Sequence, residues 1–134
     1  HIRNVIIGAS RNWCKTIIEW NLASDKNQEP HTKGGCRNCL GAVTVTKNSV
    51  DRNTAYYAIA HVSKFVPPGS KRINSSSTYH LPNVAFLTED GNIVVVVLND
   101  GDEEINFNIN SNEQSIHSSL TAGSIGTYIW DFKE

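Results

Sequence analysis

The chain has 134 residues, of which 39% are hydrophobic, and this is enough apolar surface for the core of one ordinary domain. Its 12 basic and 13 acidic residues give a formal net charge of −1, and such a balance argues against a nucleic-acid partner. The longest apolar run, Ile93–Leu98, is far shorter than the roughly 20 residues of a transmembrane helix. We therefore expect a globular protein with no membrane span.

An amphipathic helix and a buried strand are predicted at the start of the chain. Apolar residues recur at helical spacing between Asn4 and Lys15, which predicts a helix there. Thr16–Trp20 follows, and its two adjacent isoleucines without polar alternation predict a strand covered on both faces, as in a parallel sheet. Glu19, Trp20 and Asn21 stand at the exit of this strand.

A long polar loop precedes a second predicted helix. Residues 23–40 lack any apolar period, and loops of this length are commonly functional. A short strand is predicted over Ala42–Val45, and Asn53 has the side chain that caps a helix over Thr54–Phe65. The expected buried face of that helix consists of Tyr56, Ile59, Ala60 and Ser63. The order helix, strand, long loop, helix is typical of a β/α layer architecture.

After residue 70 the pattern changes to short strands separated by turns. The segment Thr88–Asn92 contains the Asp-Gly pair of a hairpin turn. The predicted strands are Lys71–Ile73, Val84–Leu87, Ile93–Leu98, Ile105–Ile109, Ser115–Leu120 and Ser124–Trp130. Short strands at this regular spacing predict an antiparallel sandwich, whose core we expect to contain Tyr128 and Trp130.

The exit of the first strand is the candidate binding site. In a parallel β/α barrel the residues just beyond each strand's C-terminal end face the active site. Trp20 offers an apolar face and Asn21 a donor and an acceptor, the mixture that a sugar ring needs. The alternative, favoured by composition alone, is that Trp20 is a core residue and Asn21 a turn former. Glu19 is a single carboxylate where glycoside hydrolysis needs two, and Glu29 is expected to be solvated.

The loop around Cys36 and Cys39 has three interpretations. With His31, the C-x-x-C pair could supply three zinc ligands, but no fourth is evident. A thioredoxin-like role would place the pair at a helix start, whereas Gly34 and Gly35 indicate a loop. We favour a local disulfide, or two reduced thiols that shape the loop.

Other chemically capable residues have simpler interpretations. Cys14 on the first helix is expected to be a small buried apolar side chain. The isolated histidines at positions 61, 80 and 117 have no evident metal-ligand partners and are interpreted as structural. The triplet Asn74-Ser75-Ser76 is an N-glycosylation sequon, which matters only in a eukaryotic secretory protein.

Several sequence blocks, taken in order, resemble the C-terminal portion of glycoside hydrolase family 30, the family of glucosylceramidases and related β-glucanases. The blocks are RNWCKTIIEWNLA, GGCRNC, YYAIAHVSKFVPPGSKRI, LPNVAF, DGNIVVVVLND and AGSIGTYIW, and together they cover about residues 2–130. The resemblance implies a retaining glycosidase with a (β/α)8 barrel and an attached β-sandwich. Residues 1–69 would then be the C-terminal end of the barrel and 70–134 the sandwich, a mainly β chain with an α/β remnant.

The resemblance also assigns roles to the candidate residues. Trp20 borders the sugar-binding subsite with Asn21 beside it, and no cofactor or metal is implied. The rim of the cleft would consist of Glu19, Gly34, Gly35, Cys36 and Cys39. The expected substrate of the intact enzyme is a β-glucoside or β-glucan, and the expected location is secreted, periplasmic or lysosomal.

The catalytic residues are where the chain departs from the family pattern. Both catalytic glutamates of the family precede the region represented here, so we expect this chain to need an N-terminal barrel and to be inactive alone. The family's sandwich also takes a strand from the N-terminal side, which would leave an unpaired edge here. The alternative function is a free-standing, non-catalytic carbohydrate-binding sandwich.

Overall fold

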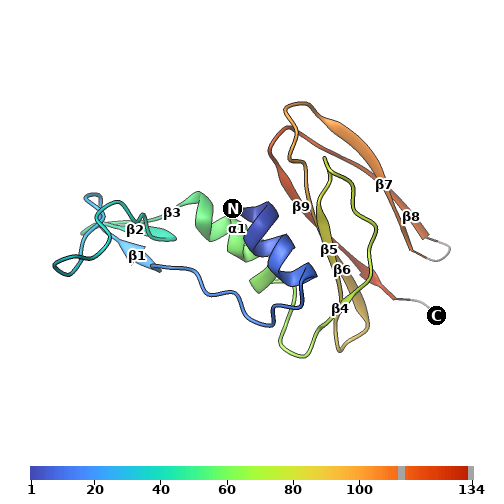
Figure 1. The fold of residues 1–134 in the computed structure, drawn as a ribbon, viewed down its shortest axis with the longest axis horizontal. Helices are drawn as coiled ribbons and strands as arrows, with labels where there is room; N and C mark the ends of the chain where they lie inside the picture. The colour runs from blue at the N-terminus through green and yellow to red at the C-terminus, as the bar shows by residue number, and fades with distance from the viewer. Residues whose placement is uncertain (112–113, 133–134) are drawn as a thin grey trace.

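The fold is mainly β, as predicted (Figure 1). The computed structural model describes residues 1–111 and 114–132; the parts of the predicted sandwich at 112–113 and 133–134 lie outside these ranges. A strand-rich body stands at one end of the molecule and a small sheet at the other, with two helices between them. Within the described residues, no helix has the length and apolar character needed to cross a membrane.

The body is built on a four-stranded antiparallel sheet with the order β4-β5-β6-β9. Its strands are β4 (Lys71–Ile73), β5 (Asn83–Leu87), β6 (Asn92–Leu98) and β9 (Ile125–Asp131). Strand β6 is buried from Ile93 through Leu98, and such a continuous apolar run is characteristic of a strand covered on both faces. The hairpin predicted at Thr88–Asn92 is confirmed, since β5 and β6 pair directly across it.

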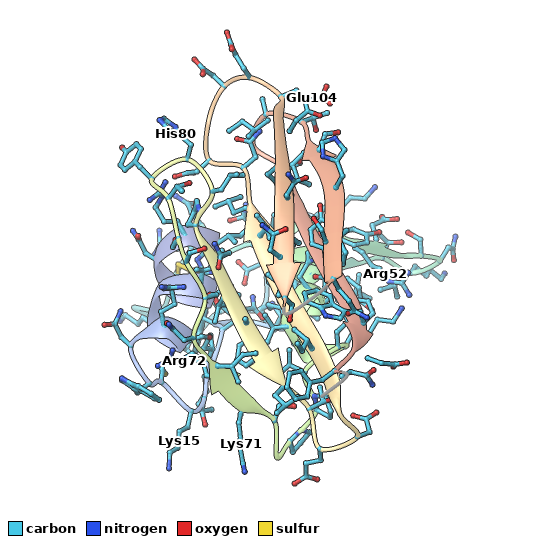
Figure 2. All side chains as sticks on the ribbon, turned by 90° about the vertical axis from the view of Figure 1, so that its right-hand side faces the viewer. Lys15, Arg52, Lys71, Arg72, His80 and Glu104 are labelled. Atoms are coloured by element: carbon cyan, nitrogen blue, oxygen red, sulfur yellow. A yellow bond between two sulfur atoms is a disulfide. The ribbon has the colours of Figure 1, made fainter. Side chains whose placement is uncertain are left out.

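One face of the sheet packs against a second layer, β7 (Ile105–Ser111) paired with β8 (Gln114–Leu120). Figure 2 shows this ribbon in front of the larger sheet. Tyr128 packs in the core between the layers, as predicted, with its ring edge-to-face against Phe107 at 5.8 Å between centroids. Trp130 packs against the same buried cluster, so the predicted sandwich is confirmed in its strands and in its core.

The other face of the sheet is covered by two helices, η1 (Ile2–Ala9), a π-helix, and α1 (Thr54–Ser63). Ile7 of η1 joins Val94 and Val96 of β6 in one buried cluster, and Val62 of α1 packs against it. The apolar residues of β6 therefore alternate between contacts with the helices and contacts with the β7–β8 ribbon. The four-stranded sheet is therefore packed on one face against the helices and on the other against the second layer of the sandwich.

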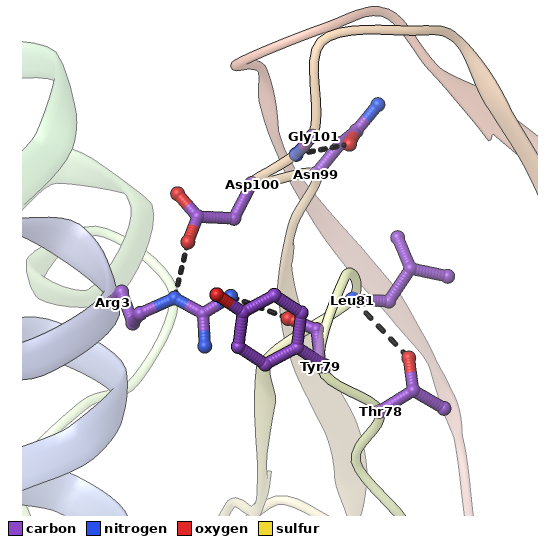
Figure 3. Close-up of polar contacts among 7 residues, drawn as sticks. All are labelled: Arg3, Thr78, Tyr79, Leu81, Asn99, Asp100 and Gly101. Atoms are coloured by element: carbon purple, nitrogen blue, oxygen red, sulfur yellow. Dashed lines mark hydrogen bonds and ion pairs between the residues drawn. The ribbon is translucent and has the colours of Figure 1, made fainter.

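Helix η1 is also fixed to the body by polar contacts (Figure 3). The guanidinium of Arg3 donates to the carboxylate of Asp100 and to the backbone carbonyl of Tyr79. It also stacks over the Tyr79 ring, 4.9 Å from the centroid. A planar guanidinium favours this combination of forked donation and stacking. The contacts tie the first turn of the chain to residues 76 and 97 positions away in sequence.

The first helix is shorter than predicted. A helix was expected over residues 4–15, but η1 ends at Ala9 and a short helical turn continues only to Arg11. Trp13 has a left-handed backbone, with φ 68°, and the amide of Cys14 bonds back to the carbonyl of Ala9 at 3.0 Å. Left-handed residues of this kind terminate helices. Cys14 therefore lies beyond the helix and is exposed, so the prediction that it is buried is wrong.

The second helix begins where it was predicted but differs in its cap and its buried face. Asn53 occupies the cap position, yet its side-chain amide donates to the carbonyl of Gly41 at 2.8 Å instead of bonding to the helix. Ala58 is the buried residue of α1, whereas Ser63, predicted on the buried face, is exposed. Tyr56, Ile59 and Ala60 of the predicted face are half-buried, and the helix packs against η1, β3 and β9.

The small sheet contains β1 (Ala23–Ser24), β2 (Val43–Val45) and β3 (Val50–Arg52) in that order. Strand β2 confirms the strand predicted over residues 42–45, and it pairs parallel to β1 and antiparallel to β3. The strand predicted over Thr16–Trp20 is wrong for the described chain. A strand needs a neighbour for its backbone groups, and regular pairing with β2 begins only at Ala23.

His61 is a structural residue, as predicted, and it joins α1 to β9. Its Nδ1 lies 2.8 Å from the hydroxyl oxygen of Thr127, and that hydroxyl lies 3.3 Å from the His61 carbonyl. Since the single hydroxyl proton is donated to the carbonyl, Nδ1–H is the donor in the first bond. Burial lowers the pKa of His61 below its ordinary value of 6.5, because desolvation disfavours the charged imidazolium.

We predict that the protein loses stability as the pH falls below 6.5, in part through His61. Below that value the unfolded chain binds more protons than the folded one, so the contribution is present above 6.5 and lost as the pH falls toward the folded pKa. Urea unfolding at a series of pH values measures the slope. His61→Gln should flatten it, while His117→Gln, an exposed histidine on β8, should not. Equal slopes in the two variants would contradict the assignment.

Candidate functional site

The segment leading to the candidate site has two different faces. Ile18, Trp20 and Leu22 are 88%, 79% and 76% exposed. The residues that alternate with them, Ile17, Glu19 and Asn21, are half-buried. This alternation is the period of an extended chain, although the segment is unpaired. The interpretation of Trp20 as a core residue is therefore wrong for the described chain, and its indole lies on the surface in an apolar row.

Asn21 fixes the direction of the chain directly after Trp20. Its backbone is left-handed, with φ 71°, a conformation that Asn tolerates better than most residues. Its carbonyl accepts from the amide of Ala42 at 3.0 Å, and its side-chain amide donates to the carbonyl of Cys39 at 3.3 Å. The chain bends at Trp20 and Leu22, on either side of Asn21, and the structure brings Asn21 together with Cys39, a predicted rim residue.

The Cys36–Cys39 pair is a disulfide, with 5.7 Å between the two Cα atoms. Of the interpretations left open by the sequence, the local bridge is confirmed. Bridged sulfurs have no thiolate to offer a metal, and the described residues contain no group of three His, Cys, Asp or Glu side chains arranged for one. Gly34, with φ 82°, and Gly35 lie in the turn just before the bridge.

The rest of the loop is braced by short polar contacts. The Asp25 carboxylate accepts from the amides of Asn27 and Glu29, both at 2.8 Å. Glu29 pairs in turn with His31, whose Nδ1 lies 2.8 Å from its carboxylate. The Glu29 side chain is 46% exposed, in agreement with the predicted solvation, and its contact with His31 holds it within its own loop.

Glu19 lies apart from Trp20 and faces the helices. Its carboxylate accepts from His1 Nε2 at 2.8 Å. Glu19 also lines a groove of about 860 Å³, together with Trp13 and Cys14. Trp20 and Asn21 do not line this groove. Among the described residues that line this groove, Glu19 is the one carboxylate, so the groove lacks the pair of carboxyl groups that hydrolysis needs. Glu19 and Trp20 point to opposite sides of one segment.

Gly41 is the residue of this region that the sequence reasoning missed. A Cβ at this position would lie 2.9 Å from the backbone of Ala23 and Ser24. Its amide donates to the Ser24 hydroxyl at 3.1 Å, and its carbonyl accepts from Asn53. A glycine immediately before a predicted strand was the available sign of this close backbone approach. Because Gly41 has no side chain, the backbone that follows Cys39 packs directly against Ala23 and Ser24, shortly after Trp20.

Comparison with known proteins identifies the family. The description "Glycosyl hydrolase family 30 beta sandwich domain" matches residues 69–128. The chain belongs to glycoside hydrolase family 30. It is 37% identical over 69% of its length to an endo-1,6-β-D-glucanase of Aspergillus fumigatus and 32% identical over 84% to the lysosomal acid glucosylceramidase of Mus musculus. This family 30 chain spans 20% and 22% of those two relatives.

Solved structures agree with the family assignment across nearly the whole chain. An endo-β1,6-glucanase matches with a TM-score of 0.89 and 30% identity, over 98% of this chain and 30% of that one. SrfJ from Salmonella typhimurium matches with a TM-score of 0.90 and 25% identity, over 98% of this chain and 30% of that one. The helices and the small sheet are therefore part of the shared family 30 architecture, together with the sandwich.

We predict that Gly41→Ala loosens the small sheet, because the added methyl group collides with backbone that cannot rotate away. Overpacking of this kind typically costs about 1–3 kcal/mol. Thermal unfolding and limited proteolysis within residues 25–40 measure the effect. Gly34→Asn is the matched control, since nothing lies within 4 Å of its Cβ position and Asn accepts the positive φ. Equal protease resistance in Gly41→Ala and the unsubstituted protein would contradict this role.

Proposed function

We propose that this chain is the C-terminal part of a retaining glycoside hydrolase that acts on β-glucosides or β-glucans. Residues 1–69 form the end of its (β/α)8 barrel and residues 70–134 its β-sandwich. The family assignment supports this proposal, as does the match of the sandwich description to residues 69–128. The known relatives include endo-1,6-β-glucanases and a glucosylceramidase.

The observation that carries the proposal is the exposed apolar row of Ile18, Trp20 and Leu22. Such a row on an extended segment is suited to packing in a parallel barrel, where alternate side chains face inward. If the rest of the barrel supplies the neighbouring strand that this unpaired segment lacks here, Trp20 stands at the carboxyl end of a barrel strand, where its flat face stacks on a sugar ring. Asn21 follows at the turn and keeps its amide bonded to Cys39.

The loop closed by the Cys36–Cys39 bridge serves as the rim of the cleft in this proposal. It reaches Trp20 through Asn21, and the close approach at Gly41 fixes its far end. The rim therefore shapes access to the sugar subsite without taking part in bond cleavage. No cofactor or metal is required, since glycoside hydrolysis proceeds with carboxylates alone.

The bond-breaking residues are assigned to the barrel that precedes this region. A retaining enzyme needs two carboxyl groups about 5–5.5 Å apart. Glu19 faces away from Trp20 and is engaged by His1, so it is a poor candidate for either role. The disulfide favours an oxidising location, and a secreted, periplasmic or lysosomal enzyme satisfies this condition.

We predict that Trp20→Ala in the intact enzyme lowers kcat/KM for a β-glucoside by about tenfold to a hundredfold, the factor that corresponds to ~1.4–2.8 kcal/mol. Steady-state kinetics with an aryl β-glucoside measure it. Trp13→Ala is the matched control. Trp13 is likewise exposed, at 73%, but it stacks on Arg72 in the groove that Glu19 lines, away from the proposed sugar subsite. An unchanged kcat/KM for Trp20→Ala would remove Trp20 from the site.

We also predict that this chain alone does not hydrolyse an aryl β-glucoside. A protein extended upstream by about 300 residues, enough for a whole barrel, should be active. Hydrolysis by the short chain that Glu19→Gln abolishes would refute the assignment of the catalytic carboxylates to the barrel. Oligosaccharide binding by residues 70–134 that does not depend on Trp20 would instead favour a non-catalytic binding sandwich.

A further inference from the structure

The sequon Asn74-Ser75-Ser76 lies on the surface, directly after β4. Figure 2 shows that the chain between Arg72 and His80 runs along the side of the sandwich, from one end of the body to the other. Asn74 and Ser76 are exposed, and Ser75 between them is partly buried. No hydrogen bond among the described residues engages the side-chain amide of Asn74. A group attached to this amide would project from the fold.

The backbone of the sequon is held in place by residues from two other segments of the chain. Arg11 donates to the Ser75 hydroxyl at 2.9 Å and to the Ser75 carbonyl at 3.0 Å. Asn83 at the start of β5 donates to the Ser76 carbonyl at 2.7 Å. These contacts use Ser75 and the backbone, so they leave the side chains of Asn74 and Ser76 free. The fold can therefore retain a bulky substituent on Asn74 without losing an internal contact.

A second observation concerns the compartment in which the chain folds. The Cys36–Cys39 disulfide lies in an exposed loop, and bridges of this kind form and persist in oxidising environments such as the endoplasmic reticulum lumen. The same lumen carries out N-linked glycosylation at surface sequons of secretory proteins. The disulfide is therefore compatible with folding in this lumen, where an accessible sequon meets the glycosylation machinery.

We propose that Asn74 is an N-glycosylation site when the protein is made in a eukaryotic secretory pathway. The co-substrate is a lipid diphosphate-linked oligosaccharide. The Asn74 side-chain nitrogen forms a bond to C1 of the first sugar, the bond between C1 and the diphosphate oxygen breaks, and the amide loses one proton to the solution. The Ser76 hydroxyl completes the sequon that the transferase recognises.

The position of the glycan has a physical consequence for the sandwich. Strand β4 is an outer strand of its sheet, and unpaired outer strands invite association between molecules. Asn74 also borders an opening of about 370 Å³ between the two layers, which Phe107 and Trp130 line with apolar surface. A hydrated oligosaccharide at Asn74 stands over both features and hinders self-association there.

The test is secretion of the full-length protein from insect cells, followed by mass spectrometry of the peptide that contains Asn74. We expect a glycan on this peptide, and treatment with peptide:N-glycosidase should convert Asn74 to aspartate. Asn74→Gln and Ser76→Ala should both lose the glycan. Ser75→Ala is the matched control and should keep it, since it leaves the sequon intact and removes the hydroxyl bonded to Arg11.

Two results would overturn the proposal. One is an unmodified Asn74 peptide from the secreted protein in which Cys36 and Cys39 are bridged, because that protein has passed through the lumen without modification. The other is a glycan that persists on this peptide in Asn74→Gln. If the Asn74→Gln variant fails to fold, the unsubstituted protein alone decides the question through the conversion of Asn74 to aspartate.

Discussion

The structure depends on one sheet that is buried on both faces. Strand β6 has six consecutive buried residues, Ile93–Leu98, and full burial of each aliphatic side chain contributes about 1.5–3 kcal/mol. Alternate residues pack against the β7–β8 ribbon and against the two helices. Because of this arrangement, the helices and the sandwich are not independent. A change in the core of β6 is felt in both layers that it joins.

The candidate site is linked to this core by individual polar and steric contacts rather than by a continuous apolar interior. Helix α1 is bonded to β9 through His61 and Thr127, and Asn53 at its start holds Gly41. Gly41 packs against Ala23, two residues beyond Asn21. Each step is a short-range polar or steric contact. This chain of contacts positions the surface on which Trp20 lies.

The exposed row of Ile18, Trp20 and Leu22 conflicts with what a soluble surface usually presents. Scattered exposed apolar residues are ordinary, but several along one extended segment indicate an interaction surface. Natural proteins tend to break local rules of this kind at functional positions. The conflict therefore supports a role for this segment in packing and ligand contact. On the other face of the segment, by comparison, Glu19 makes an ordinary polar contact with His1.

The sequence by itself determined the strands from β4 to β9, the hairpin at Thr88–Asn92 and the start of α1, because turn residues and local periodicity specify them within a few positions. Only the tertiary structure decided the rest. Thr16–Trp20 is unpaired because strand pairing depends on a neighbour that is distant in sequence. The side chain of Asn53 donates to the carbonyl of Gly41 instead of capping α1. The importance of Gly41 is set by the backbone of Ala23 and Ser24. These features depend on contacts between residues far apart in the chain, which local pattern does not encode.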